Sequence, residues 1–430
     1  MKKDSPQYQC YVNILKEELV PAMGCTEPIA LAYAAAKART VLGALPDRVL
    51  LQVSGSIIKN VKSVIVPNTG HLKGISAAAA AGIVAGAAEK ELEVIAQVSA
   101  SEQEAIKDYL NRVQIDIQHV DWGHVFDLQV TAFLGDSWAR VRITDFHTNI
   151  VLIEKDGAVL FEKPVSEKEI YESRTDRSLL NVADIWDFAT TADISDVETI
   201  LERQIRFNNA IAEEGLLGDY GANIGSTLLA TYGNDVTVRA KAKAAAGSDA
   251  RMNGCELPVI INSGSGNQGI TCSVPLIEYA KELHCGKEKL YRALILSNLV
   301  AIHEKTGIGT LSAYCGAVSA GAGAGAGIAY LCGGDYQAVI HTVVNALAIV
   351  SGIVCDGAKA SCAAKIASSV DAGILGYKMY CRGQEFKGGD GIVMHDIEST
   401  IRSIGMLGKE GMQSTNEEII RLMISGDAQR

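Results

Sequence analysis

One uncharged stretch of small residues constrains the fold of this chain more than any other feature. Between Tyr314 and Gly334 no residue is formally charged, and Gly and Ala alternate from Gly321 to Gly327. Residues without large side chains let helices approach one another closely. A membrane span is the alternative, but Ala, Gly and Ser gain little on transfer into lipid compared with Leu, Ile and Phe. We therefore expect buried, closely packed helices, with a membrane or scaffold protein as the non-enzyme alternative.

The length and charge of the chain narrow the class of protein. At 430 residues the chain is longer than one hydrophobic core usually organises, which indicates two or three domains. Its 39 Lys and Arg against 50 Asp and Glu leave a net charge of −11, and no basic block is present. Nucleic acid is therefore not an expected partner, because phosphate backbones attract basic surfaces. The polar start lacks the apolar core of a signal peptide, which predicts a cytoplasmic location.

The pattern of apolar residues divides the chain into a mixed first part and a helical second part. Residues 1–165 combine helical runs with strand-like runs such as 126–133, which predicts an α/β domain. Residues 166–195 are rich in charge and are interpreted as a solvated connector with short helices. Long helical patterns dominate residues 196–430 and predict a mainly helical domain. The expected fold class is therefore α+β.

The most distinctive loop of the sequence is rich in Gly and polar residues. It runs from Ile261 to Gly269 and follows an apolar run. Glycines allow backbone amides to converge on an oxyanion, and hydroxyl and amide side chains add donors. The loop is therefore interpreted as a binding site for a carboxylate or a phosphate, formed by Ser263, Gly264, Ser265, Gly266, Asn267 and Gln268.

Nucleotide binding by this loop is disfavoured. Gly264, Gly266 and Gly269 satisfy G-x-G-x-x-G, but the surrounding pattern is helical, and the Lys-Ser/Thr end of a P-loop is absent. Pro275 also fits badly inside the long helix that such a fingerprint should open. A pyridoxal-phosphate lyase stays open as an alternative, because the loop is suited to that cofactor's phosphate. No Lys in the sequence has a distinctive setting for that cofactor.

The ten cysteines are too sparse for a disulfide scaffold, and no C-x-x-C pair is present. Cys25, Cys315 and Cys355 stand out because their small neighbours leave room for a bulky inorganic group. Cys25 also lies at a predicted helix start, where backbone amides and the helix dipole lower the pKa of a thiol. Cys362, seven residues after Cys355, is the next candidate to line the same site.

Four segments of the chain together form a recognisable signature. They are Pro21 to Pro28, the Ser263 to Gly269 loop, Tyr314-Cys315-Gly316 with the Ala/Gly helix after it, and Gly352 to Gly357. These segments resemble the L-cysteine desulfidase family, which is related to the iron–sulfur L-serine dehydratases, and the resemblance covers nearly the whole chain. It implies fused dehydratase-like β and α domains and a [4Fe-4S] cluster on Cys25, Cys315 and Cys355.

The chemistry implied by this resemblance is an α,β-elimination. Three thiolate ligands leave one iron of the cluster open to the β-substituent of an amino acid. Loss of the α-proton and of sulfide from L-cysteine gives aminoacrylate, which yields pyruvate and ammonia. Asn68 and Thr69 are expected as a second polar wall of the substrate site. Lys359, His71 and Lys73 are the candidates for the base that removes the α-proton.

One departure from the dehydratase pattern decides the predicted substrate. The Gly-Pro-Ser-Ser-Ser-His-Thr stretch of the dehydratase β domain has no copy here, and Gly24-Cys25-Thr26-Glu27 occupies a comparable helix start. We therefore expect L-cysteine as the substrate, with a serine dehydratase-like lyase for another β-substituted amino acid as the alternative. The oligomeric state is left open, and a homo-oligomer is one alternative.

Overall fold

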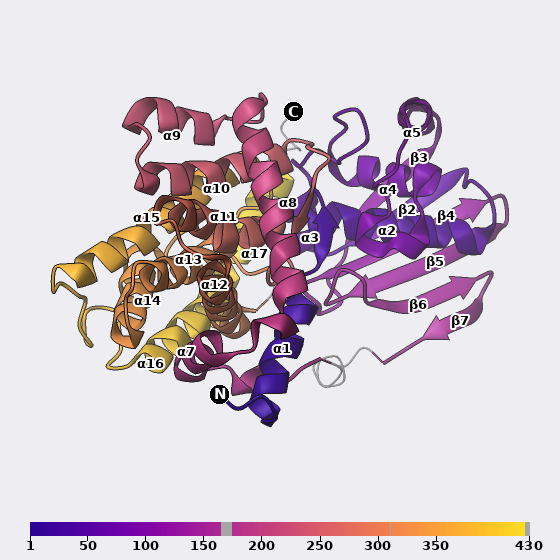
Figure 1. Ribbon diagram of the computed structural model, residues 1–430. Coiled ribbons are helices and arrows are strands. Elements are labelled where there is room, and N and C mark those ends of the chain that lie inside the picture. Colours follow the sequence, from indigo (N-terminus) through magenta and orange to yellow (C-terminus); the bar gives the residue numbers. More distant parts are fainter. Residues whose placement is uncertain (165–173, 310, 426–430) are drawn as a thin grey trace.

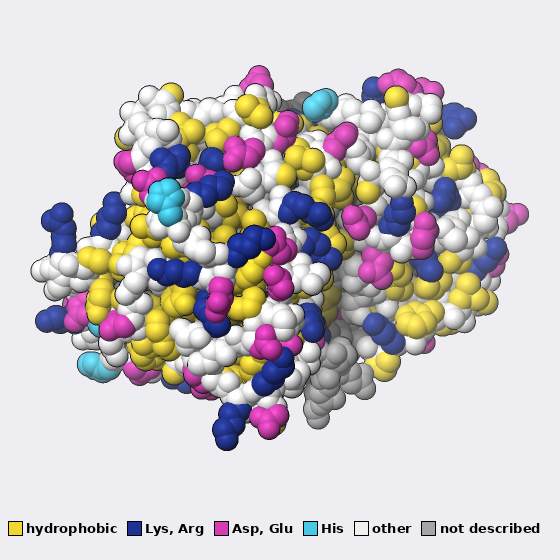
Figure 2. All heavy atoms as spheres, viewed as in Figure 1, with side chains coloured by type: hydrophobic (Ala, Val, Ile, Leu, Met, Phe, Trp, Pro, Cys, Tyr) yellow, Lys and Arg dark blue, Asp and Glu magenta, His cyan; other side chains and the backbone are white. Residues whose placement is uncertain are grey.

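The computed structural model describes residues 1–164, 174–309 and 311–425 and places a mixed sheet beside a bundle of helices (Figure 1). The sheet belongs to the first part of the chain, and helices dominate from residue 182 onward. The α+β class expected from the sequence is therefore confirmed. On the face drawn in Figure 2, Lys and Arg side chains are interspersed with Asp and Glu side chains.

Six strands form the main sheet in the order β3-β2-β4-β5-β6-β7. Strands β2 and β3 are parallel, and the other neighbouring strands are antiparallel. Side chains such as Val130 and Val141 face each other across two strands and are fully buried, because helix α2 covers that face. The strands are β2 (Arg48–Val53), β3 (Gln114–His119), β4 (Asp127–Leu134), β5 (Ser137–Thr144), β6 (Ile150–Lys155) and β7 (Ala158–Glu162).

Four helices accompany the sheet. Helix α4 packs directly on α2, where a Cβ built at Gly82 would lie 2.0 Å from the Ala32 carbonyl oxygen. Only glycine permits this approach, so the two Ala-rich helices form one layer over the sheet. The helices are α2 (Thr26–Leu42), α3 (Gly55–Val61), α4 (Gly74–Ala85) and α5 (Ala100–Arg112).

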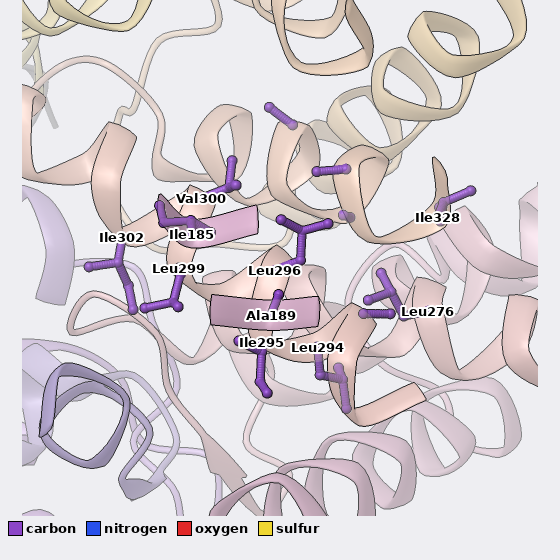
Figure 3. Packing of buried hydrophobic residues seen from close by; sticks show 14 of the residues in the cluster. Ile185, Ala189, Leu276, Leu294, Ile295, Leu296, Leu299, Val300, Ile302 and Ile328 are labelled. Atoms are coloured by element: carbon purple, nitrogen blue, oxygen red, sulfur yellow. The ribbon is translucent and has the colours of Figure 1, made fainter. Parts of the chain in front are cut away.

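The helical half is larger and contains most of the buried apolar residues. Figure 3 shows Leu296 and Val300 in one cluster with Ile185, Leu276 and Ile328, which come from three other helices. The helices of this half are α7 (Val182–Thr191), α8 (Glu198–Leu217), α9 (Ile224–Tyr232), α10 (Val236–Met252), α11 (Gly266–Glu282), α12 (Lys287–Ile308), α13 (Gly316–Leu331), α14 (Tyr336–Val350), α15 (Cys362–Cys381) and α16 (Ile397–Met406).

The first and last described helices each pack against the half of the molecule that is distant from them in sequence. Helix α1 (Pro6–Glu18) places Tyr8 and Tyr11 in the core of the helical half. Helix α17 (Gln413–Ser425) contacts α3 beside the sheet. In the interval expected as a solvated connector, α7 instead buries Ile185 and Phe188, because apolar residues line one side of this short helix. Residues 166–173 of that interval lie outside the described residues.

Helix α13 is the uncharged stretch that the sequence singled out. It packs against α11, α12, α14 and α15. A Cβ built at Gly321 would lie 2.5 Å from the backbone of Ser369, and one at Gly325 would lie 2.8 Å from the Cα of Gly373. The expectation of buried, closely packed helices is confirmed. Within the described ranges, no helix is long and apolar enough to cross a membrane.

The argument that Pro275 opposes a long helix after the Gly-rich loop is wrong, because α11 continues through this residue. Proline lacks an amide hydrogen and leaves nearby carbonyls without their helical donors. Side-chain hydroxyls form hydrogen bonds to other carbonyls of this helix. Ser297 Oγ donates to the Cys272 carbonyl at 2.9 Å, and Ser273 Oγ donates to the Gly269 carbonyl at 2.7 Å.

We expect Gly321→Ala to destabilise the protein by about 2 kcal/mol. Overpacking against the Ser369 backbone costs up to about 3 kcal/mol, and the better helix propensity of Ala returns about 1 kcal/mol. Denaturant unfolding of the two proteins measures the difference. Gly352→Ala is the control, because a Cβ there meets nothing within 4 Å. Equal stability of Gly321→Ala and the parent protein would contradict this account of the helix contact.

Candidate functional site

A cavity of about 320 Å³ is lined by residues from both halves of the molecule. Its wall includes Cys25, Cys315 and Cys355, the three cysteines selected from the sequence. Cys362 lines it as well, as expected from its position after Cys355. Every residue from Ser263 to Gln268 except Gly266 also belongs to this wall. The structure thus brings the cysteines and the polar loop together in one place.

Two short antiparallel pairings bring these distant segments together. Strand β1 (Pro21–Met23) pairs with β8 (Pro258–Ile260), so the segment before Cys25 lies beside the segment before the loop. Thr26 Oγ1 then donates to the Gly264 carbonyl at 2.9 Å. These contacts fix the start of α2 against the loop.

The second pairing sets Cys315 beside Cys355. Tyr314 and Val354 form an isolated antiparallel bridge. The Cys315 amide donates to the Ile353 carbonyl at 3.1 Å, and the Cys355 amide donates to the Ala313 carbonyl at 2.6 Å. A Cβ built at Gly357 would lie 2.0 Å from the Lys59 carbonyl oxygen, so the Cys355 segment also rests directly on α3.

Three of the four cysteines in the described cavity wall lie at the start of a helix. Cys25 and Cys315 are the N-terminal caps of α2 and α13, and Cys362 is the first residue of α15. The lowered pKa expected for Cys25 is not found in the structure. Burial raises its pKa well above the usual value, the Glu27 charge raises it further, and the thiol donates to Glu27 Oε2 at 3.0 Å.

Cys315 and Cys355 behave as a hydrogen-bonded pair. The hydrogen bond with Cys315 lowers the pKa of Cys355 to about 5, and Lys59 and Lys305 also favour its thiolate. The same hydrogen bond, together with burial, raises the pKa of Cys315. Cys355 is therefore the more acidic of the two thiols.

Three buried cations surround the cysteines. Burial lowers the pKa values of Lys59, Arg251 and Lys305, the last to about 8. Lys59 donates to Asn416 Oδ1 at 2.6 Å, and Lys305 donates to the Gly309 carbonyl. Within the part of the chain that the structure describes, none of the three forms an ion pair with a carboxylate. Buried cations without such partners indicate an anionic occupant.

Arg251 connects these cations with the polar loop. Its Nη1 donates to Asn267 Oδ1 at 3.2 Å, while its buried Nε has no partner among the described residues. A Cβ built at Gly266 would lie 2.3 Å from this Nε, so only glycine lets the guanidinium approach the N-terminus of α11. A cation and a helix N-terminus at one place form a binding site for an anionic group.

A polar network lies on the side of the cavity near the sheet. Glu27 accepts hydrogen bonds from Cys25 Sγ and, at 3.4 Å, from Asn60 Nδ2. Burial alone would raise the pKa of Glu27, but interaction with His147 and the Cys25 thiol lowers it to about 2. Glu27 is therefore an ionised carboxylate at neutral pH.

Five other residues selected from the sequence do not appear among the described residues that line the cavity. Asn68 Nδ2 donates to the Ile95 carbonyl, and Thr69 Oγ1 donates to the Val66 carbonyl, so both stabilise a turn. His71 and Lys73 are exposed. Lys359 pairs with Asp356 at 2.5 Å. A role of these residues in substrate binding or catalysis stays a prediction.

Sequence reasoning missed several residues of the cavity wall. Glu27 lies two residues after Cys25, and its position at the helix start was a visible signal. His147 lies in the turn between β5 and β6, a kind of position where functional side chains are common. Arg251 and Lys305 lie inside helical patterns and carry no local signal. Their burial at the cavity depends on the packing of the helices.

The donor set does not suit a single metal ion. In residues 1–164, 174–309 and 311–425, no group of three or more His, Cys, Asp or Glu side chains is placed to hold one. The cysteines instead belong to three separate segments of the cavity wall.

The model of the family described as serine dehydratase alpha chain matches residues 89–421. The chain therefore carries a serine dehydratase alpha chain domain, and this domain indicates an amino-acid lyase. It begins within the sheet half and includes three of the cavity cysteines. The relation to the serine dehydratases expected from the sequence is confirmed, whereas the closer relation to the cysteine desulfidases stays a proposal.

Full-length relatives define the narrower group. A "UPF0597 protein" of Desulfitobacterium hafniense (strain Y51) is 61% identical over 425 residues, which cover 99% of each chain. One from Lachnoclostridium phytofermentans is 54% identical over 97% of this chain and 100% of its own. One from Treponema denticola is 48% identical over 99% of this chain and 100% of its own. The chain belongs to the UPF0597 family.

Proposed function

We propose that this protein is an iron–sulfur amino-acid lyase that eliminates sulfide from L-cysteine. The observation that carries the proposal is the convergence of Cys25, Cys315 and Cys355 on one cavity with the Ser263 to Gln268 loop. The serine dehydratase alpha chain domain supports the lyase class. The resemblance to cysteine desulfidases supports the choice of substrate.

The chemistry of the cavity wall fits a [4Fe-4S] cluster held by Cys25, Cys315 and Cys355. Thiolates are the usual ligands of such clusters, and three of them leave one iron without a protein ligand. Lys59, Arg251 and Lys305 offset the negative charge that three thiolates and the cluster introduce. When bound, the cluster supplies a Lewis acid for the sulfur of the substrate.

The polar loop and Arg251 are suited to the carboxylate of an amino acid. The N-terminus of α11 presents free backbone amides, and the Arg251 guanidinium lies against Gly266 at the same place. Asn267 orients the guanidinium through its Oδ1. The Gln268 side chain lies against Gly316, the residue after Cys315, so a bound carboxylate is close to the cysteines.

Leaving-group chemistry favours L-cysteine over L-serine. A thiol has a pKa of about 8.5 and leaves as a thiolate, whereas a hydroxyl group needs strong polarisation or a proton from an acid. A soft sulfur leaving group also suits iron in a site rich in thiolates.

A pyridoxal-phosphate lyase is the second candidate function. Lys305 is the one lysine among the described residues of the cavity wall, and its pKa of about 8 suits Schiff-base chemistry. The convergent cysteines would then have no role. Analysis of iron and acid-labile sulfide in anaerobically purified protein separates the two functions, because a pyridoxal enzyme needs neither.

We expect Cys315→Ala to lose the cluster and the activity together, because one of three ligands is removed. Iron and acid-labile sulfide content and the release of sulfide from L-cysteine measure both effects. Cys381→Ala is the matched control, since Cys381 is exposed at the end of α15. Full iron and sulfide content in Cys315→Ala would show that the ligand assignment is wrong.

Asn267→Ala should lower kcat/KM about ten- to hundred-fold and leave the cluster intact. A hydrogen bond to a charged group contributes about 1.5–3 kcal/mol, and the Arg251 guanidinium loses its orienting partner. Steady-state kinetics with L-cysteine measure the change, with exposed Asn234→Ala as the control. Unchanged kcat/KM would exclude Asn267 from substrate binding.

L-cysteine should be converted to pyruvate, ammonia and sulfide more efficiently than L-serine is converted to pyruvate and ammonia. The reason is the easier departure of a thiolate. The comparison uses kcat/KM for both amino acids on one reconstituted, anaerobic sample. An equal or higher value for L-serine would assign the protein to the dehydratase activity.

A further inference from the structure

We propose that His147 is the base that removes the α-proton of the substrate, with the Glu27 carboxylate as its positioning partner. This inference rests on the proposed lyase function, which requires a base in the cavity. It concerns a residue outside the sequence signature and outside the candidates Lys359, His71 and Lys73.

The backbone of a tight turn directs His147 from the sheet into the cavity. The turn connects β5 and β6, and Asp145 adopts a left-handed conformation with φ of 65°. The Asp145 amide donates to the Phe126 carbonyl at 2.9 Å, and the Asn149 amide donates to the Phe146 carbonyl at 3.0 Å. The His147 side chain is 17% exposed and belongs to the cavity wall.

The imidazole ring lies directly against the polar loop. A Cβ built at Gly264 would lie 3.2 Å from His147 Cε1 and 3.7 Å from Nδ1. Gly264 has φ of 75°, so glycine provides both the backbone conformation and the space for the ring. The Cα of an amino acid is one bond from its carboxylate. A substrate held by this loop therefore has its α-proton beside the ring.

The ring is held in place with one nitrogen toward Glu27 and the other toward the loop. Phe126 packs against it edge to face, with ring centroids 4.8 Å apart. Buried Nε2 lies on the side of Glu27, 3.9 Å from Oε1, whereas Nδ1 lies on the side of Gly264 and is the atom that takes the α-proton. Glu27 Oε1, 3.9 Å from Nε2, positions the ring so that Nδ1 points to the loop.

Other titratable groups of the cavity wall are already engaged. Glu17 and Glu18 form ion pairs with Arg177 at 3.0 and 2.6 Å. Asp145 Oδ1 lies 3.0 Å from a ring nitrogen of His124. Lys305 donates to the Gly309 carbonyl and adjoins the cysteine pair. His147 combines contact with the loop and a ring nitrogen, Nδ1, on the side of the loop.

The step balances without an additional reactant. The imidazole takes the α-proton, and the electron pair of the broken Cα–H bond forms the Cα=Cβ bond. The Cβ–S bond breaks, and sulfur leaves with its electron pair. The products are 2-aminoacrylate and sulfide, and the imidazolium returns its proton to the sulfide or to water. Tautomerisation and addition of water then give pyruvate and ammonia.

The test compares His147→Asn with the parent protein in reconstituted, anaerobic samples. We expect kcat to fall about 10²- to 10⁴-fold, the range for loss of a general base, with unchanged iron and acid-labile sulfide. Deuterium at the Cα of L-cysteine should slow the variant more than the parent, because proton removal becomes rate-limiting. Imidazole in solution should restore part of the activity of His147→Gly. His284→Asn is the control, since His284 is exposed and its φ of 51° suits Asn.

Each alternative result has a separate meaning. Activity of His147→Asn above one tenth of the parent value would overturn the assignment, as would loss of iron with no rescue of His147→Gly by imidazole. A comparable loss in Lys359→Ala, His71→Asn or Lys73→Ala, with His147→Asn active, would transfer the role to that residue. If the parent protein turns over no β-substituted amino acid, the proposed function itself fails. If the parent protein and His147→Asn are both active, the assignment of His147 as the base is wrong and the proposed lyase function still stands.

Discussion

Antiparallel pairing between distant backbone segments is the constraint on which the cavity depends. The β1–β8 pair places the segment of Cys25 beside the polar loop, and the Tyr314–Val354 bridge places Cys315 beside Cys355. The same segments carry the thiols to a place where three buried cations also lie. The backbone ladders fix the positions first, and the chemistry of the side chains follows from them.

Burial of positive charge is the main energetic cost of this arrangement. Lys59, Arg251 and Lys305 leave water without gaining a carboxylate partner among the described residues, which disfavours their charged forms. Binding of an anionic group would restore the electrostatic stabilisation that these cations lose when they leave water. The apolar helix contacts around α13 stabilise the fold and offset the cost of burying these charges.

The sequence was sufficient to predict the features that have local signals. The Ala/Gly run predicted the packing of α13, and small neighbours selected Cys25, Cys315 and Cys355, which the structure brings to one cavity. It was insufficient for Arg251 and His147, because their places in the cavity wall depend on tertiary contacts with Gly266 and Gly264. Pro275 misled the prediction of α11, since the helix continues through this residue despite the missing amide.

The position of the cavity in the chain also determines when it forms during synthesis. Its wall begins with residues of α1 and ends within α15, and α17, at the end of the described chain, supports α3 through Asn416 and Lys59. A ribosome must therefore release nearly the entire chain before the wall is complete. A group that occupies the cavity therefore meets the complete wall only after α15 has been synthesised and α17 has docked on α3.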